Sequence, residues 1–235
     1  MGKQFLERMT VIRVGDVVLE GLYHQGRGGE AVVVAPPLPG LGGTMDHAVL
    51  AEVCWALTRA GHSTLRFNWR GVGASTGRLT MPPVAATGEA EVTEAALDEA
   101  YADLAAAIEQ HIETCGAPRC AVVGYSFGAQ VAARGGVEHP AVERVVLIAP
   151  PVTRLPFDLG ALAATGAPTS IVCGELDEVA PLAAVEAAVA SSPGAAFSVR
   201  KVAGAGHPFA RGLSQLGQIV AQCFPSGAER DDLEP

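Results

Sequence analysis

Aromatic and charged residues are scarce in this sequence of 235 residues. Aromatic side chains make up 5% of the residues and charged ones 17%, whereas 49% are hydrophobic. With so few large rings, alanine and valine must supply most of the core packing. Only 16 Lys and Arg stand against 25 Asp and Glu, which gives a formal net charge of −9. Because nucleic-acid binding depends on clustered Lys and Arg, and none cluster here, the balance argues against a nucleic-acid partner.

Cysteine is also sparse, and its five positions are scattered along the chain without a C-x-x-C pair. This spacing indicates neither a zinc site nor a disulfide framework, so we expect free thiols in a reducing compartment and no metal. No hydrophobic run approaches the length of a membrane span, and residues 1–8 lack the apolar core of a secretory signal. We therefore expect a cytoplasmic protein without a membrane partner.

Short β-branched runs alternate with longer segments whose apolar residues lie three or four positions apart. Such alternation predicts an α/β fold with a mainly parallel, twisted sheet of about eight strands and helices on both faces. The first two strands lack an intervening helix and are expected to form an antiparallel edge. We expect one domain over 1–225 and a polar tail at 226–235. Strands are predicted over 5–14, 17–24, 31–35, 63–68, 120–123, 144–149, 169–174 and 196–202, and helices over 46–60, 89–114, 127–134, 181–190 and 208–223.

The segment Val122-Val-Gly-Tyr-Ser-Phe-Gly128 contains the pattern Gly-x-Ser-x-Gly. A nucleophile on a sharp turn between a strand and a helix needs residues without side chains two positions before and after it, and Gly124 and Gly128 meet this need. The pattern alone is weakly specific in a chain with 28 Gly. The apolar run before it and the helix-compatible run after it favour Ser126 as a nucleophile over an incidental serine in a glycine-rich turn.

A serine hydroxyl becomes a strong nucleophile only when a base accepts its proton, so a histidine and an orienting acid are required. Among six histidines, His207 has the best position, in a glycine-rich loop after the last predicted strand. Asp177 follows the preceding strand and is the favoured acid, with Glu175 and Glu178 as alternatives. Ser126, Asp177 and His207 occur in one of the known chain orders for such a triad. Parallel sheets place their sites at the carboxyl ends of strands, where all three are predicted to lie.

The reaction also needs two N–H groups that stabilise the negative oxygen formed on the substrate. Phe127 is predicted to supply the first, because it follows the nucleophile. The second should come from the loop at 36–45, which contains three Pro and three Gly and is predicted to be neither helix nor strand. Gly40 is the expected donor because Pro39 has no N–H, and Leu41 is the alternative.

Four short motifs occur together in this sequence: Gly42-Gly-Thr-Met, Arg66-Phe-Asn-Trp-Arg-Gly-Val-Gly-Ala-Ser, Gly124-Tyr-Ser-Phe-Gly and Gly206-His-Pro-Phe. Through them, the sequence from residue 31 to residue 224 resembles the α/β-hydrolase superfamily, and within it a small bacterial group of esterases related to dienelactone hydrolases and serine aminopeptidases. The resemblance implies Ser126 as nucleophile, Asp177 as acid and His207 as base, with Gly40 and Phe127 shaping the oxyanion hole. Two features of this chain differ from its relatives. The group usually carries His-Pro-His-Pro where this chain has Pro36-Pro-Leu-Pro. Dienelactone hydrolases use Cys at the position that Ser126 occupies here.

Lids of this superfamily usually enter between the two strands predicted at 144–149 and 169–174. Here only residues 150–168 connect these strands, and this segment is too short to form a cap domain. An open site suits esters, or thioesters, of small or exposed acyl groups, and requires no cofactor. Arg78 and Arg154 are candidates for binding a substrate carboxylate, although a solvated surface role is the commoner one for arginine. Amide or peptide cleavage, and a binding role without catalysis, remain alternatives to the ester hydrolase.

Overall fold

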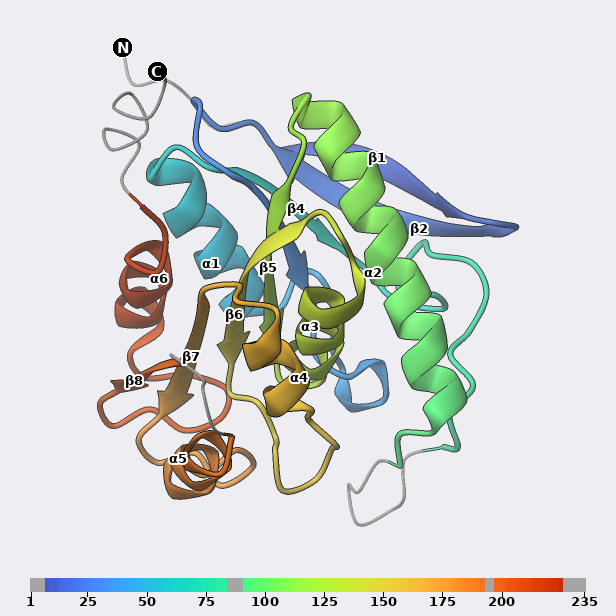
Figure 1. Cartoon of the computed structure of the whole chain (residues 1–235). Helices are drawn as coiled ribbons and strands as arrows, with labels where there is room; N and C mark the ends of the chain where they lie inside the picture. Colours follow the sequence, from blue (N-terminus) through green and yellow to red (C-terminus); the bar gives the residue numbers. More distant parts are fainter. Residues whose placement is uncertain (1–6, 84–90, 193–196, 226–235) are drawn as a thin grey trace.

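An eight-stranded sheet organises the computed structural model, which describes residues 7–83, 91–192 and 197–225 (Figure 1). Its strand order is β1-β2-β4-β3-β5-β6-β7-β8. Strand β2 pairs antiparallel with β1 and β4, and the other neighbours pair in parallel, as the sequence predicts. The strands are β1 (Glu7–Val14), β2 (Val17–His24), β3 (Ala31–Ala35), β4 (Ser63–Phe67), β5 (Cys120–Tyr125), β6 (Val142–Ile148), β7 (Thr169–Gly174) and β8 (Ser198–Val202).

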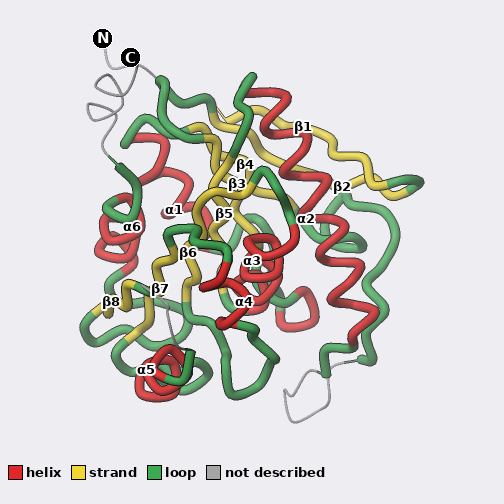
Figure 2. Tube along the Cα trace, in the orientation of Figure 1, coloured by secondary structure: helices red, strands yellow, loops and turns green. Residues whose placement is uncertain are grey.

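Helices cover both faces of this sheet, and Figure 2 shows the strands between them. In Figure 1, α1 lies beside α6 on one side, while α2, α3 and α4 lie on the other. None of the helices in the described ranges has the length and hydropathy needed to span a bilayer. The helices are η1 (Pro39–Leu41, a 3-10 turn), α1 (Ala48–Arg59), α2 (Glu94–Cys115), α3 (Phe127–Glu138), α4 (Leu159–Ala164), α5 (Leu182–Ala190) and α6 (Leu213–Ala221).

The central strands are buried on both faces, and their alternate residues enter two separate cores. Val33 and Val122 pack with the side chains of α2, α3 and α4, whereas Val32 and Val123 pack with those of α1 and α6. This division follows from the two-residue period of a strand, which sends successive side chains to opposite faces. The uninterrupted β-branched run of β3 is therefore the signature of a strand covered on both sides.

Several predicted boundaries are wrong, because capping residues rather than apolar periodicity decide where a helix begins. His47 caps α1, Thr93 caps α2 and Pro181 precedes α5, so each helix starts later than predicted. Helix α6 begins at Leu213 instead of 208, since Gly212 has a left-handed φ of +82° that interrupts the chain before it. The predicted tail at 226–235 and the predicted element ends at 5–6, 89–90 and 196 lie outside the described residues.

Two short helices lie where the sequence predicts loops. Pro39–Leu41 forms a 3-10 turn inside the 36–45 loop, because a proline with fixed φ suits the first helical position and Gly42, at φ +81°, closes the turn. Helix α4 lies in the connection between β6 and β7, where the Asp158 carboxylate accepts a 2.7 Å hydrogen bond from Ala161 N–H. Neither helix is long enough to form a lid.

Candidate active site

Ser126 occupies the sharp turn between β5 and α3. Its backbone has φ +56° and ψ −116°, a left-handed conformation that costs a residue with a Cβ about 1–2 kcal/mol. The turn is tight enough that a Cβ on Gly124 would collide with the carbonyl oxygen of Gly128. A Cβ on Gly128 would lie 2.6 Å from the carbonyl oxygen of Pro36. Both glycines of the motif are thus required by close backbone approaches, as the sequence predicts.

The three residues selected from the sequence meet in one hydrogen-bonded chain. His207 Nε2 lies 3.0 Å from Ser126 Oγ, and His207 Nδ1 lies 2.8 Å from Asp177 Oδ2. An ionised carboxylate only accepts hydrogen bonds, so Nδ1 carries the proton and Nε2 is left to accept the serine hydroxyl. This is the arrangement in which a histidine can act as a base towards a serine.

Asp177 is 5% exposed at the end of β7. Burial alone would raise its pKa, but hydrogen bonds from His207 and from the N–H groups of Ala180 and Val179 outweigh burial and hold the pKa below its ordinary value. Both backbone bonds, each 2.8 Å long, end on Oδ1. The carboxylate therefore stays charged beside the imidazole at neutral pH, where it stabilises a positive charge on His207.

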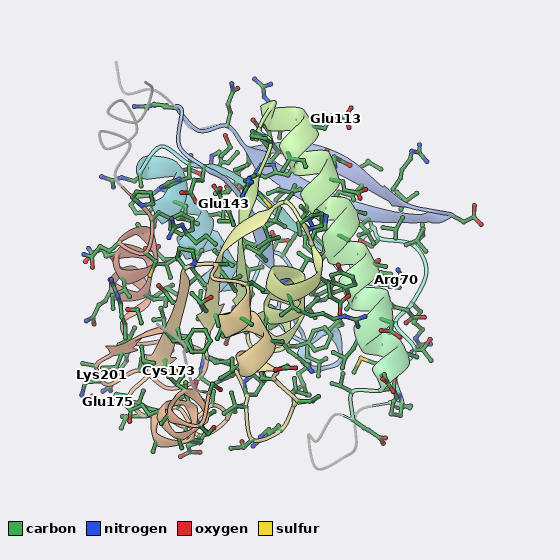
Figure 3. The ribbon with its side chains drawn as sticks, in the orientation of Figure 1. Arg70, Glu113, Glu143, Cys173, Glu175 and Lys201 are labelled. Carbon is green, nitrogen blue, oxygen red and sulfur yellow. The ribbon has the colours of Figure 1, made fainter. Side chains whose placement is uncertain are left out.

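The two alternative acids are exposed and do not reach His207. Glu175 pairs instead with Lys201, whose Nζ lies 2.8 Å from Glu175 Oε1, and Figure 3 shows the two side chains together at the β8 edge. It also accepts a 3.0 Å hydrogen bond from Gly204 N–H. Glu178 is exposed and forms no bond to the histidine. Among the predicted acids, the structure brings only Asp177 to the base.

Tyr125, which sequence reasoning missed, lies against His207 although it directly precedes Ser126. Its ring centroid lies 5.5 Å from that of His207 and 5.1 Å from that of His47. Its hydroxyl donates a 2.9 Å hydrogen bond to the backbone oxygen of His207. Tyr125 thereby fastens the loop that carries the imidazole. Burial and the neighbouring His207 lower the pKa of His47, which keeps a second positive charge away from the site.

Three of the seven N–H groups of the 36–45 loop are engaged inside its 3-10 turn. Leu41 N–H, the alternative oxyanion donor, bonds to Leu38 O at 3.2 Å. Within the described residues, the N–H groups of Leu38, Gly40, Thr44 and Phe127 donate to no protein acceptor. The structure thus leaves the N–H groups of both predicted donors, Phe127 and Gly40, without a protein partner, and does the same for Leu38 and Thr44. The other engaged groups are Gly42 N–H to Pro39 O at 2.9 Å and Gly43 N–H to Leu38 O at 3.0 Å.

Side chains at the end of β4 and just after it hold the 36–45 loop at both ends. Asn68 Oδ1 accepts a 2.7 Å bond from Met45 N–H, and Arg66 Nη1 donates a 2.9 Å bond to Met45 O. At the other end, Trp69 Nε1 donates to the carbonyl oxygens of Pro36 and Pro37. The sequence Arg66-Phe-Asn-Trp therefore positions the loop through long-range contacts.

A cavity of about 510 Å³ adjoins the same loop. Its lining includes Gly40, Gly42 and Gly43 of the loop, together with Arg78 and apolar residues such as Leu79. No Asp or Glu occurs among the described residues that line it. Arg154 is exposed and does not line the cavity. No group of three or more described His, Cys, Asp or Glu residues is placed to hold a metal ion.

Comparison with known proteins places this geometry among α/β serine hydrolases. An α/β serine hydrolase homologue from Coxiella burnetii superposes with a TM-score of 0.77 at 27% identity, covering 92% of this chain and 96% of that one. A serine hydrolase without a lid from Xanthomonas campestris has a TM-score of 0.75 at 21% identity, covering 97% of each chain. The predicted α/β-hydrolase fold without a cap is thus confirmed.

Sequence comparisons agree with the structural ones. An uncharacterised protein of Rickettsia prowazekii is 29% identical over 164 residues, which cover 68% of this chain. The matched region spans 63% of the length of that curated relative. The family model of the serine aminopeptidases, S33, matches residues 38–165, which is more than half of the sequence. The chain therefore belongs to the S33 serine aminopeptidase family of hydrolases.

Proposed function

We propose that the protein is a serine hydrolase that cleaves carboxylic esters, or thioesters, through an acyl-enzyme on Ser126. The observation that carries the proposal is the 3.0 Å separation of Ser126 Oγ and His207 Nε2, with the Asp177 carboxylate 2.8 Å behind the imidazole. A chance cluster of polar residues would not place a base, its orienting acid and a serine on a strained turn in this order.

In the proposed reaction, His207 accepts the hydroxyl proton as Ser126 Oγ attacks the ester carbonyl. Asp177 stabilises the resulting imidazolium without taking its proton. The carbonyl oxygen becomes negative and is stabilised by Phe127 N–H at the start of α3 and by an N–H of the 36–45 loop, for which Gly40 is the donor predicted from the sequence. The imidazolium then protonates the leaving alcohol, and water hydrolyses the acyl-enzyme with His207 again as base.

Cleavage of amides or peptides is the competing activity, because the family is described by its aminopeptidases. An aminopeptidase must bind a positively charged α-amine, for which carboxylates are the natural partners. The described lining of the cavity beside Gly40 holds Arg70 and Arg78 and no carboxylate. Arg70 is paired with Asp103, whose Oδ1 lies 2.6 Å from Arg70 Nη2, so Arg78 carries the positive charge of the lining. This distribution of charge favours neutral or anionic esters over N-terminal peptides.

The test is hydrolysis of p-nitrophenyl esters of increasing chain length by the wild type and by Ser126→Ala. We expect kcat/KM to fall by about 10⁴-fold or more in the variant, because removal of the nucleophile leaves only binding and oxyanion stabilisation. Each ester is compared with its matching p-nitroanilide, and a faster anilide would indicate a peptidase. A binding protein without catalysis would hydrolyse none of them and would resist labelling of Ser126 by a phosphonate.

A further inference from the structure

Trp69 contacts both sides of the proposed oxyanion hole. The side chain is fully buried, and its Nε1–H lies 3.1 Å from Pro36 O and 3.2 Å from Pro37 O. Its ring meets that of Phe127 edge-on, with centroids 5.6 Å apart at 74°. Phe127 supplies one proposed donor, and the peptides held by the indole lead into the loop that supplies the other.

A bond to the carbonyl of Pro37 also orients the N–H of Leu38. The two groups belong to one peptide plane, and in a trans peptide they point in opposite directions. No peptide bond among the described residues is cis. With Pro37 O fixed towards the buried indole, Leu38 N–H must point away from it.

The peptides held by the indole lie close to the nucleophile turn. Strand β3 pairs in parallel with β5, and Ala35 lies opposite Gly124, two residues before Ser126. The carbonyl oxygen of Pro36 approaches the same turn, since a Cβ on Gly128 would lie 2.6 Å from it. Leu38 N–H, which donates to no acceptor among the described residues, therefore belongs to a segment that begins against the turn carrying Ser126.

Gly40, the donor predicted from the sequence, is held in a different way. Its N–H belongs to the peptide whose carbonyl, Pro39 O, accepts the 2.9 Å bond from Gly42 N–H that closes the turn. Gly40 also lines the adjoining cavity. The N–H of Gly40 is thus oriented by a hydrogen bond within the turn itself. The N–H of Leu38 is instead oriented by the side chain of Trp69, which also contacts Phe127.

We propose that Trp69 is a positioning residue of the oxyanion hole, and that by holding the carbonyl of Pro37 it directs the N–H of Leu38 at the developing oxyanion. The inference rests on the proposed function, because it assigns parts of the same site. Within the described residues, the indole N–H is the only protein donor to Pro36 O and Pro37 O. Its loss frees both peptides to turn while the triad stays intact.

The first experiment removes the N–H and keeps the ring system. Trp69 is replaced by β-(3-benzothienyl)alanine, in which sulfur takes the place of N–H, and in parallel by Phe. We expect kcat for a p-nitrophenyl ester to fall by about 100-fold, as for a small misplacement of a catalytic group, with KM nearly unchanged. Affinity for a boronic acid, which forms a tetrahedral adduct on the serine, should fall in proportion to kcat. Unchanged kcat in folded protein would overturn the proposal.

The second experiment removes one backbone donor at a time. Leu38 has φ −64°, which proline adopts without strain, so Leu38→Pro deletes the N–H while Leu38→Ala keeps it and controls for the lost side chain. We expect kcat to fall by about 100-fold or more in Leu38→Pro relative to Leu38→Ala. Gly40→Pro is compared with Gly40→Ala in the same way. Loss at Gly40 with retention at Leu38 would refute the assignment.

The wild type separates failure of this inference from failure of the proposed function. A wild type that neither hydrolyses esters nor takes up a phosphonate refutes the serine hydrolase, and the roles of Trp69 and Leu38 with it. An active wild type whose kcat survives the benzothienyl replacement refutes only the positioning role. If Leu38→Pro fails to fold, the benzothienyl variant and the boronic acid affinities still decide that role.

Discussion

His111 on α2 should make the stability of this protein fall steeply in mild acid. Its side chain is 1% exposed, and its Nε2 lies 3.1 Å from Ser63 O. The Tyr23 ring packs edge-on at 5.7 Å, and Cys115 Sγ lies 3.8 Å from Nδ1. Burial lowers the pKa of His111 from 6.5 to about 4, so the imidazole is neutral in the folded protein and donates its Nε2–H to Ser63 O.

The direction of the effect follows from where the proton binds. As the pH falls below the ordinary value of 6.5, the unfolded chain takes up a proton at His111, whereas the folded chain does not until the pH nears 4. Acid therefore favours unfolding over this interval. At 1.36 kcal/mol per pKa unit, the free energy of unfolding should drop by roughly 2 kcal/mol between about pH 7 and about pH 5, and by about 3 kcal/mol once the pH reaches 4.

Urea unfolding at both pH values measures this loss in the wild type and in His111→Gln. Glutamine keeps an N–H donor for Ser63 O but does not titrate, so all other ionisations cancel in the difference between the two proteins. The variant should lose about 2 kcal/mol less than the wild type between pH 7 and pH 5. An equal loss in both proteins would refute the reasoning, since it would mean that His111 takes up its proton without unfolding.

Two further substitutions test the nucleophile turn and the acid. Gly128→Ala should destabilise the fold by about 1–3 kcal/mol and lower ester hydrolysis, because the new Cβ would lie 2.6 Å from Pro36 O. Gly160→Ala, whose Cβ would be 3.5 Å from its nearest neighbour, is the matched control in urea unfolding, and equal stabilities would contradict the steric argument. Asp177→Asn should lower kcat by about 10⁴-fold, since an amide permits the wrong tautomer of His207, and a loss below tenfold would exclude Asp177 as the orienting acid.

The arrangement of the sheet and the meeting of Ser126, Asp177 and His207 could be predicted because both depend on signals within short segments. Apolar runs identify the buried strands, and each of the three residues lies within five positions of the end of a strand. A parallel sheet then brings the carboxyl ends of its strands to one edge, whatever the lengths of the connections. Distant residues thus become neighbours through topology alone.

Features that depend on particular long-range contacts could not be predicted in this way. Trp69 reaches Pro36 across 33 positions of the sequence, and Tyr125 reaches His207 across 82. No periodicity marks either pair. The start of α6 could not be predicted for another reason, since the apolar residues at 208–210 favour an earlier start, while Gly212 turns the backbone out of the helical conformation.

The left-handed backbone conformation of Ser126 lowers the stability of the fold at the position where the proposed reaction needs a hydroxyl group. Glycine would adopt φ +56° without strain, so selection for thermal stability alone would favour glycine at position 126. Every protein with that glycine would lack the hydroxyl. Under the proposed function the serine is required for turnover, so a thermostable descendant that keeps it must offset the strain elsewhere in the chain.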